Sequence, residues 1–200
     1  ILYFLVIKAA KEKGIIENNQ EAELVKSILQ LPSIIVDALS LESEIKLAAQ
    51  ELSKASNAIF LGRGAMYPLA LEGALKLKEI SYIHAEGYAS GELKHGPIAL
   101  VDENMPVIVL APKDELFDKT VSNMHEVMAR GGKVLLITDT EGASEAQEGT
   151  WKTIIMPKIS NDLAPILYSI PAQLLAYHTA VSKGTDVDQP RNLAKSVTVE

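Results

Sequence analysis

From residue 58 onward, short aliphatic runs alternate with stretches of helical periodicity, and this alternation allows few folds. The aliphatic runs lie at residues 58–61, 82–85, 107–110, 133–138 and 153–157. Helical patterns cover residues 68–80, 117–129 and 164–182, and the last of these ends at Gly184. Nearly continuous apolar strands separated by helices are typical of parallel sheets that are covered on both faces. The sequence therefore predicts an α/β fold with five parallel strands. Ligands of such sheets gather at the carboxyl ends of the strands, where we expect the loops 62–64, 86–97 and 111–112 to lie.

The first 54 residues follow a different pattern. The apolar run 1–7, followed by lysines and Gly14, predicts the last turns of a buried helix that ends at the glycine. The run is shorter than the roughly 20 apolar residues of a membrane-spanning helix. It also lacks the basic stretch that precedes the apolar part of a signal peptide. Residues 21–54 have helical spacing, and Pro32 is expected to open a new helix, since proline is tolerated in a first turn. We expect the chain to begin inside an element, with a further domain upstream.

Charge and cysteine content exclude several classes of protein. The formal net charge of −7 argues against a general nucleic-acid binder, which needs a basic face for phosphates. The chain contains no cysteine, which excludes a disulfide framework, a cysteine-ligated zinc site and thiol catalysis. These properties favour a cytoplasmic protein that binds neither nucleic acid nor a membrane.

Three charged residues are spaced so that they share one face of the helix predicted at 68–80. Glu72, Lys76 and Glu79 stand at i, i+4 and i+7. The spacing is compatible with two solvated ion pairs. It is equally compatible with an enzyme site, where a lysine beside a carboxylate anchors a proton-transferring base and polarises an oxygen. Gly73 and Ala74 lie among these charges and leave room for a close neighbour.

Two glycine-containing segments follow predicted strands. In the first, Gly62-x-Gly64 resembles a dinucleotide fingerprint without its third glycine, which favours a tight strand-to-helix turn over a nicotinamide site. In the second, His95 precedes Gly96-Pro97, a rigid turn beside a natural acid–base group. A histidine that hydrogen-bonds a neighbouring loop is the alternative. No motif in the sequence has the spacing of a metal site.

The tail 185–200 is polar, yet Pro190 and the alternating Val197 and Val199 favour an ordered, packed conformation over a frayed end. Lys195 lies between apolar neighbours in this tail. Partial burial there would favour the neutral amine that Schiff-base chemistry needs.

These motifs together resemble those of the glucosamine-6-phosphate synthase family, the glutamine–fructose-6-phosphate aminotransferases. The resemblance rests on residues 61–64, 70–86, 91–97 and 186–200 and covers essentially the whole chain. It implies the SIS (sugar isomerase) fold, a flavodoxin-like three-layer α/β arrangement preceded by a helical connector. On this basis, residues 1–20 end a first SIS domain, residues 21–54 form the connector and residues 55–184 form a complete second SIS domain. Residues 185–200 are a C-terminal tail that closes on the active site.

The resemblance also implies an activity, because the family makes glucosamine 6-phosphate from fructose 6-phosphate and glutamine-derived ammonia. Glu79 corresponds to the base that takes a proton from the C1 side of the sugar. Lys76 and Glu72 correspond to its supporting charges. His95 corresponds to the histidine that opens the sugar ring and is donated in trans across a homodimer interface.

The tail residues have implied roles as well. Lys195 corresponds to the lysine that forms a Schiff base with the ketose, and Ala194 beside it is expected to contact the substrate. The family binds the sugar phosphate mainly on Ser/Thr-rich loops of its first SIS domain, which this chain lacks, so the fragment is expected to be inactive alone. Its expected partners are a sugar phosphate, an N-terminal glutaminase domain and the first SIS domain. No metal or organic cofactor is implied.

Two alternatives to this activity remain. One is a non-catalytic SIS module that senses a sugar phosphate, although a sensor would not need Glu79, His95 and Lys195 together. The other is a related deglycase that acts on an amino-sugar phosphate with the same isomerase chemistry but without glutamine.

Overall fold

Five parallel strands form the sheet, as the aliphatic runs predict. The computed structural model describes residues 1–193. The strands lie in the order β2-β1-β3-β4-β5, and every neighbouring pair is parallel. Their bounds are β1 Asn57–Gly62, β2 His84–Ala89, β3 Pro106–Leu110, β4 Lys133–Asp139 and β5 Lys152–Met156. The second strand begins at His84, two residues later than predicted, because Tyr82 forms the C-cap of the preceding helix.

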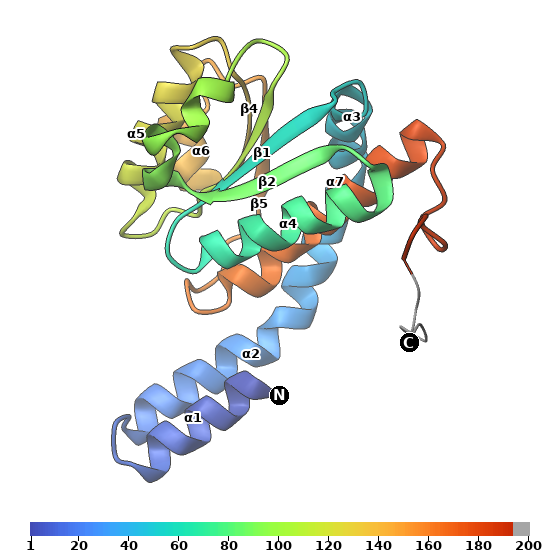
Figure 1. Ribbon diagram of the computed structural model, residues 1–200. Coiled ribbons are helices and arrows are strands. Elements are labelled where there is room, and N and C mark those ends of the chain that lie inside the picture. Colours follow the sequence, from blue (N-terminus) through green and yellow to red (C-terminus); the bar gives the residue numbers. More distant parts are fainter. Residues whose placement is uncertain (194–200) are drawn as a thin grey trace, which may run out of the picture.

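Helices cover both faces of the sheet, so the predicted three-layer arrangement is confirmed (Figure 1). One face carries α3 (Glu42–Leu52), α4 (Met66–Ser81) and α7 (Ala164–Lys183), with α7 in contact with both of the others. The other face carries α5 (Phe117–Met128) and α6 (Thr140–Ala146). The short helix α6 was not predicted from the sequence. Among residues 1–193 no single helix is long and apolar enough to span a bilayer, and only α2 with α3 passes such a test, as a pair bent by 54°.

Two apolar cores follow from the alternation of side chains along the strands. In β1, Ala58 and Phe60 point into the core beneath α3, α4 and α7, whereas Ile59 and Leu61 point into the core beneath α5. Successive side chains of a strand face opposite sides of the sheet, so a strand that is buried on both sides must be apolar throughout. This requirement explains why the central strands β1, β3 and β4 appear in the sequence as nearly unbroken apolar runs.

The crossover from β2 to β3 contains no α-helix. Residues Ser90–His95 and Pro97–Leu100 form two 3-10 helices, η1 and η2, and η1 packs against α5. Leu93 of η1 is fully buried in the core on that face. The expectation of a loop over residues 86–97 is therefore wrong in part, since its first four residues belong to β2 and the rest covers the sheet.

An antiparallel helical hairpin precedes the sheet and projects from it (Figure 1). It consists of α1 (Leu2–Glu12) and α2 (Asn18–Leu39). Pro32 lies inside α2, so the expectation that it opens a new helix is wrong. A helix can continue through a proline at the cost of one backbone hydrogen bond. Here the continuation carries Ala38, fully buried, into the core beside α7.

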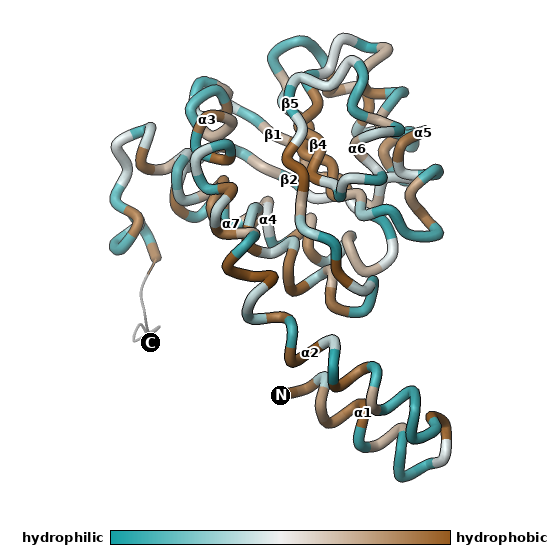
Figure 2. The backbone as a smooth tube through the Cα atoms, turned by 180° about the vertical axis from the view of Figure 1, so that it is seen from behind, coloured by the Kyte–Doolittle hydropathy of each residue, from teal (hydrophilic) through white to brown (hydrophobic). Residues whose placement is uncertain are grey.

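The first helix is present as predicted, but it is not buried. Within α1 only Ile7 is buried, whereas Leu2, Leu5 and Val6 are 79%, 58% and 63% exposed. Figure 2 shows apolar residues along both α1 and α2, outside the layered domain. The expectation of burial is wrong for the described residues, because α1 contacts α2 and little else.

Gly73 determines how closely α4 approaches the sheet. A Cβ atom at this position would lie 2.8 Å from a ring carbon of Phe60 in β1 and 3.5 Å from Cβ of Ala172 in α7. The close neighbour that the sequence led us to expect beside Gly73 and Ala74 is therefore the Phe60 ring. The contact fixes the position of α4, and with it the three charged residues of that helix.

We expect Gly73→Ala to lower the free energy of unfolding by about 1–3 kcal/mol, because overpacking against Phe60 outweighs the gain in helix propensity. Denaturant unfolding measures the change. Adding Phe60→Leu to this variant should recover part of the loss, because the smaller side chain makes room and the two sites are in contact. A Gly73→Ala variant as stable as the wild type would show that the two layers can separate at no cost.

Candidate active site on helix α4

The charged face of α4 forms the contacts that its spacing predicts. Lys76 Nζ donates a hydrogen bond to Glu79 Oε2 at 2.6 Å, and Glu72 Oε1 lies 3.9 Å from the same nitrogen. The hydrogen bond to Glu79 raises the pKa of Lys76 above its usual value, desolvation partly opposes this, and the charges of Glu79 and Glu72 reinforce it. The lysine is therefore protonated at neutral pH. Its contribution to stability is complete below the ordinary lysine pKa and is lost only as the pH rises through the raised value.

These side chains are neither buried nor fully solvated. The side chains of Lys76, Glu79 and Glu72 are 36%, 29% and 46% exposed. The buried face of α4 packs on the sheet and on α7, which leaves the charged residues at the margin of the contact. A ligand can reach all three groups without displacing the core.

An open cavity of ≈ 240 Å³ lies beside Glu79 at the C-terminal end of α4. It lies between this helix and the last described residues, and its lining comprises Leu75, Lys78, Glu79, Tyr82, Arg191, Asn192 and Leu193. A larger cavity of ≈ 440 Å³ lies near the amino-terminal ends of β1, β3 and β4, and none of the predicted site residues lines it. We regard the smaller cavity as the candidate site, because Glu79, the predicted base, lines it.

The described part of the tail is packed against the end of α4, which agrees with the expectation of an ordered conformation. The Thr185 hydroxyl donates to the Ile80 carbonyl oxygen at 2.6 Å. The backbone N–H of Arg191 donates to Tyr82 Oη at 2.9 Å. Ala194 and Lys195, which the sequence predicts at the substrate, lie outside the described residues.

His95 lies at the end of η1, and its side chain is exposed. Gly96, with φ 151° and ψ −57°, follows it in a conformation that only glycine adopts readily. A turn is thus present at Gly96-Pro97, as predicted. Within residues 1–193 the imidazole of His95 makes no hydrogen bond to a neighbouring loop.

The structure does not bring His95 and Glu79 together in one chain. Glu79 belongs to α4, which packs on the same face of the sheet as α7. His95 follows Leu93, whose side chain is buried on the face of α5. The elements that carry the two residues therefore pack on opposite faces of the sheet, and no hydrogen bond or ion pair joins the two side chains within the described part of the chain.

The Gly62-Arg63-Gly64 segment forms the tight turn that was predicted. A Cβ atom on Gly62 would lie 2.2 Å from the carbonyl oxygen of Met66, so only glycine fits. The N–H groups of Met66 and Tyr67 donate to Arg63 and Gly64 within the turn, so they are not free to bind a phosphate. Arg63 instead donates to Asn123 Oδ1 at 2.9 Å and links the turn to α5.

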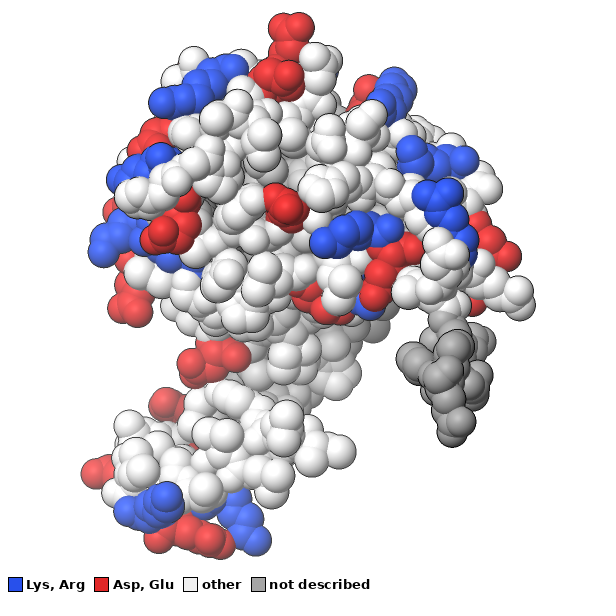
Figure 3. All heavy atoms as spheres, viewed as in Figure 1, with Lys and Arg blue, Asp and Glu red and all other residues white. Residues whose placement is uncertain are grey.

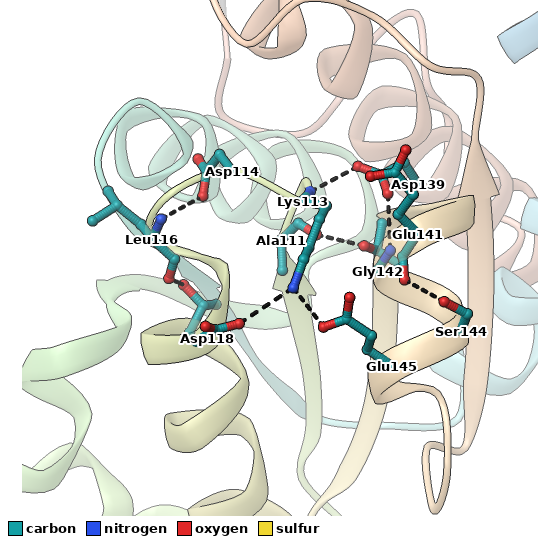
Figure 4. A network of polar contacts seen from close by, with 12 residues as sticks. Ala111, Lys113, Asp114, Leu116, Asp118, Asp139, Glu141, Gly142, Ser144 and Glu145 are labelled. Atoms are coloured by element: carbon teal, nitrogen blue, oxygen red, sulfur yellow. Dashed lines mark hydrogen bonds and ion pairs between the residues drawn. The ribbon is translucent and has the colours of Figure 1, made fainter.

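A polar network joins β3, β4 and the helices that follow them (Figure 4). The backbone N–H of Lys113 donates to Asp139 at 2.7 Å, and Asp139 also accepts from Gly142 and caps α6. The Lys113 ammonium contacts Asp118 and Glu145. This network occupies the carboxyl ends of the two strands with contacts inside the chain.

A second histidine, His178, joins two helices of the domain. His178 is 6% exposed, and its Nε2 lies 3.0 Å from Glu42 Oε1, so it links α7 to α3. Residues 1–193 bring together no group of three or more histidine, aspartate or glutamate side chains that could hold a metal ion. On the face seen in Figure 3, acidic and basic side chains are interspersed rather than gathered into a broad basic surface.

The sheet order, the covering helices and the site on α4 define a class of protein that sequence comparison identifies. The sequence profile of the SIS domain family matches residues 51–183, and the chain therefore belongs to the SIS domain family. Within that class it is similar to curated proteins named glutamine–fructose-6-phosphate aminotransferase [isomerizing]. The protein from Rhizobium meliloti is 60% identical over 201 residues, and that from Bradyrhizobium diazoefficiens is 59% identical over 200 residues. Both alignments span 100% of this chain and 33% of the relative, so the chain spans about a third of the length of these proteins.

Comparison with solved structures also finds similarity to this group of aminotransferases. The C-terminal domain of glucosamine-fructose-6-phosphate aminotransferase from Francisella tularensis is 46% identical, with a TM-score of 0.89 over 92% of this chain and 52% of that one. A glucosamine-6-phosphate deaminase from Thermotoga maritima is 24% identical, with a TM-score of 0.66 over 98% of this chain and 55% of that one. The second likeness concerns the fold alone. The resemblance read from the sequence motifs is thus confirmed, and with it the SIS fold.

Proposed function

We propose that this chain is the isomerase part of an enzyme that converts fructose 6-phosphate and glutamine-derived ammonia into glucosamine 6-phosphate. The observation that carries the proposal is the Lys76–Glu79 pair, half-exposed beside an open cavity. It occurs in a chain that is 60% identical to a protein named glutamine–fructose-6-phosphate aminotransferase [isomerizing]. The two alternatives, a sugar-phosphate sensor and a deglycase, have no observation that favours them.

The chemistry assigns a proton transfer to Glu79. Ammonia adds to the C2 carbonyl of the ketose, and loss of water gives an imine. Glu79 then takes a proton from C1 while the imine nitrogen gains one, which gives an enaminol; return of a proton to C2 with loss of the proton on the C1 hydroxyl leaves an aldehyde at C1 and an amine at C2. The hydrogen bond of 2.6 Å from Lys76 holds the carboxylate in place, and its ammonium can stabilise negative charge that develops on a substrate oxygen. Glu72 supports the lysine from 3.9 Å.

We further propose that the active form is a homodimer in which His95 acts on the sugar bound by the partner subunit. The packing of the elements that carry His95 and Glu79 on opposite faces of the sheet supports this arrangement. So does an exposed apolar stripe on α4, formed by Tyr67, Leu71 and Leu75 at 37%, 44% and 42% exposure. The three residues are spaced i, i+4 and i+8 beside the charged face, and such a stripe is typical of a surface that another protein covers.

Mixing two inactive variants of the full-length enzyme, His95→Ala and Glu79→Gln, is expected to restore activity. In a heterodimer with shared sites, one site carries both substitutions and the other carries neither. Random exchange between equal amounts of two-fold symmetric dimers would restore about a quarter of the wild-type sites. Glucosamine 6-phosphate formation after exchange, proven with differently tagged subunits, measures the recovery. If exchanged dimers stay inactive, His95 belongs to the site of its own subunit.

The remaining partners follow from the length of the relatives. About two thirds of each relative lies outside the match, and we expect a glutaminase domain and a first SIS domain with the main phosphate loops there. In our proposal Ala194 and Lys195 complete the sugar site from the tail. We place the enzyme in the cytoplasm, in keeping with a chain that contains no cysteine. The proposed chemistry requires no cofactor.

A further inference from the structure

We propose that Tyr82 is a positioning residue, which fastens the C-terminal segment to the end of α4 and so holds Asn192 and Leu193 in the wall of the Glu79 cavity. The inference rests on the proposed function for its catalytic consequence. Its structural part, the attachment of residues 185–193 to Tyr82, stands on the contacts alone.

The backbone of Tyr82 is unusual for a residue of its kind. It caps α4 in the left-handed region, with φ 61° and ψ 15°. The helix α7 ends in a similar conformation, with φ 72° at its C-cap, but there the residue is Gly184. Side chains other than those of glycine, asparagine and aspartate disfavour this region, and an aromatic residue in it is an outlier. An outlier of this kind is retained where the side chain has a task.

The Tyr82 side chain makes two contacts with a single residue of the tail. Its hydroxyl oxygen accepts the backbone N–H of Arg191 at 2.9 Å. The Arg191 guanidinium carbon lies 4.2 Å from the centre of the Tyr82 ring, in cation–π geometry. The first contact fixes the backbone of the tail, and the second closes the guanidinium over the ring. Together they hold Arg191 by both its main chain and its side chain.

A second attachment lies two residues from Tyr82 on the same helix. The Thr185 hydroxyl donates to the carbonyl oxygen of Ile80, one of the carbonyls that the end of a helix leaves without a partner. Between the two attachments, Asp186 accepts the N–H groups of Asp188 and Gln189 at 2.9 and 3.0 Å. The segment from 185 to 191 is thus a short loop with both ends on the last turn of α4.

The attachment also determines where the tail goes next. Asn192 and Leu193 line the same cavity as Glu79. Releasing Arg191 from Tyr82 would free Asn192 and Leu193 to leave this position, and the cavity beside Glu79 would lose part of its wall.

Three variants of the full-length enzyme separate these contributions. Tyr82→Phe removes the acceptor of the Arg191 N–H but keeps the ring. Tyr82→Leu removes both contacts, and Tyr82→Gly also removes the unfavourable left-handed conformation. The control is Tyr177→Phe on α7, an exposed tyrosine that contacts His178 edge to face and none of the site residues named above.

We expect kcat for glucosamine 6-phosphate formation to fall about 10- to 100-fold in Tyr82→Leu, because misplacing the residues that position a substrate costs this much, and less in Tyr82→Phe. Hydrogen exchange of the amides from 186 to 193 should accelerate in the same order. Glutamine hydrolysis and the control variant should stay at the wild-type level. Tyr82→Gly should unfold at the same or a higher denaturant concentration than the wild type, yet lose kcat as Tyr82→Leu does.

Wild-type kcat and wild-type amide protection in Tyr82→Leu and Tyr82→Gly would overturn the proposal and leave Tyr82 as an ordinary helix cap. If the wild-type enzyme forms no glucosamine 6-phosphate, the proposed function fails. The exchange experiment still decides in that case whether Tyr82 holds the tail. Faster exchange without a change in kcat would retain the attachment and reject its role in catalysis.

Discussion

Glu79→Gln in the full-length enzyme is expected to lower glucosamine 6-phosphate formation by about 10²- to 10⁴-fold, the usual cost of losing a positioned base. Glutamine hydrolysis should stay close to the wild-type rate, because the substitution removes no group from the glutaminase. The structural alternative predicts a different result. A partly exposed ion pair contributes about 0–1 kcal/mol, so its loss would change stability slightly and activity hardly at all. Sugar product and released glutamate are therefore measured separately.

The chain offers a matched control for this experiment. Glu51 of α3 and Lys54, which follows the end of that helix, form an i,i+3 pair at 2.7 Å, close to the 2.6 Å of the Lys76–Glu79 pair. Glu51→Gln should leave both activities unchanged and alter stability as little as Glu79→Gln does. If Glu79→Gln keeps nearly normal sugar turnover, Glu79 is a surface ion-pair partner and the proposed base must be sought elsewhere.

Lys195→Arg is expected to abolish a covalent adduct that the wild type forms. If the tail lysine makes an imine with fructose 6-phosphate, borohydride should reduce it and fix a sugar phosphate on Lys195 in the full-length protein. Arginine keeps the positive charge, but its guanidinium does not readily form an imine. Mass spectrometry of the trapped protein locates the adduct. Isomerisation should fall along with trapping.

The control for this second experiment is Lys183→Arg, an exposed position at the end of α7. It should trap the sugar as the wild type does. An adduct on a different lysine, or full isomerisation by Lys195→Arg, would remove Lys195 from the mechanism. Lys195 lies outside the described residues, so the adduct would give the first location of this side chain relative to the sugar.

Local patterns in the sequence were sufficient to predict the fold and the face that carries the candidate base. Central strands that are buried on both sides must be apolar almost throughout, so β1, β3 and β4 can be recognised from the sequence, whereas the edge strand β2 carries polar residues and begins two residues later than predicted. The i, i+4, i+7 spacing of Glu72, Lys76 and Glu79 places them on one face whatever surrounds the helix. Gly184 ends α7 as predicted, because glycine has no Cβ to oppose the left-handed conformation.

Other features depended on residues far apart in the chain, and the sequence could not reveal them. Pro32 lies within one continuous helix, whose far end is held by the burial of Ala38 against α7. The crossover after β2 covers the face of α5, because Leu93 finds its apolar partners there. In both cases a local preference for a helix boundary or a loop was outweighed by burial against distant elements.

The sequence by itself determined the SIS fold and the residue types available for catalysis, whereas the tertiary structure decided which of them meet. Tyr82 and Arg191 are 109 positions apart, and no periodic pattern links a helix cap to a tail. Glu79 and His95 are only 16 positions apart in sequence, yet the elements that carry them pack on opposite faces of the sheet. The spacing of apolar and charged residues shows which face of a single helix or strand is buried, because side chains recur on the same face at the period of that element. Which residues of different elements come into contact depends on how the helices pack on the sheet. This packing is determined only when the apolar faces of the elements are buried against one another.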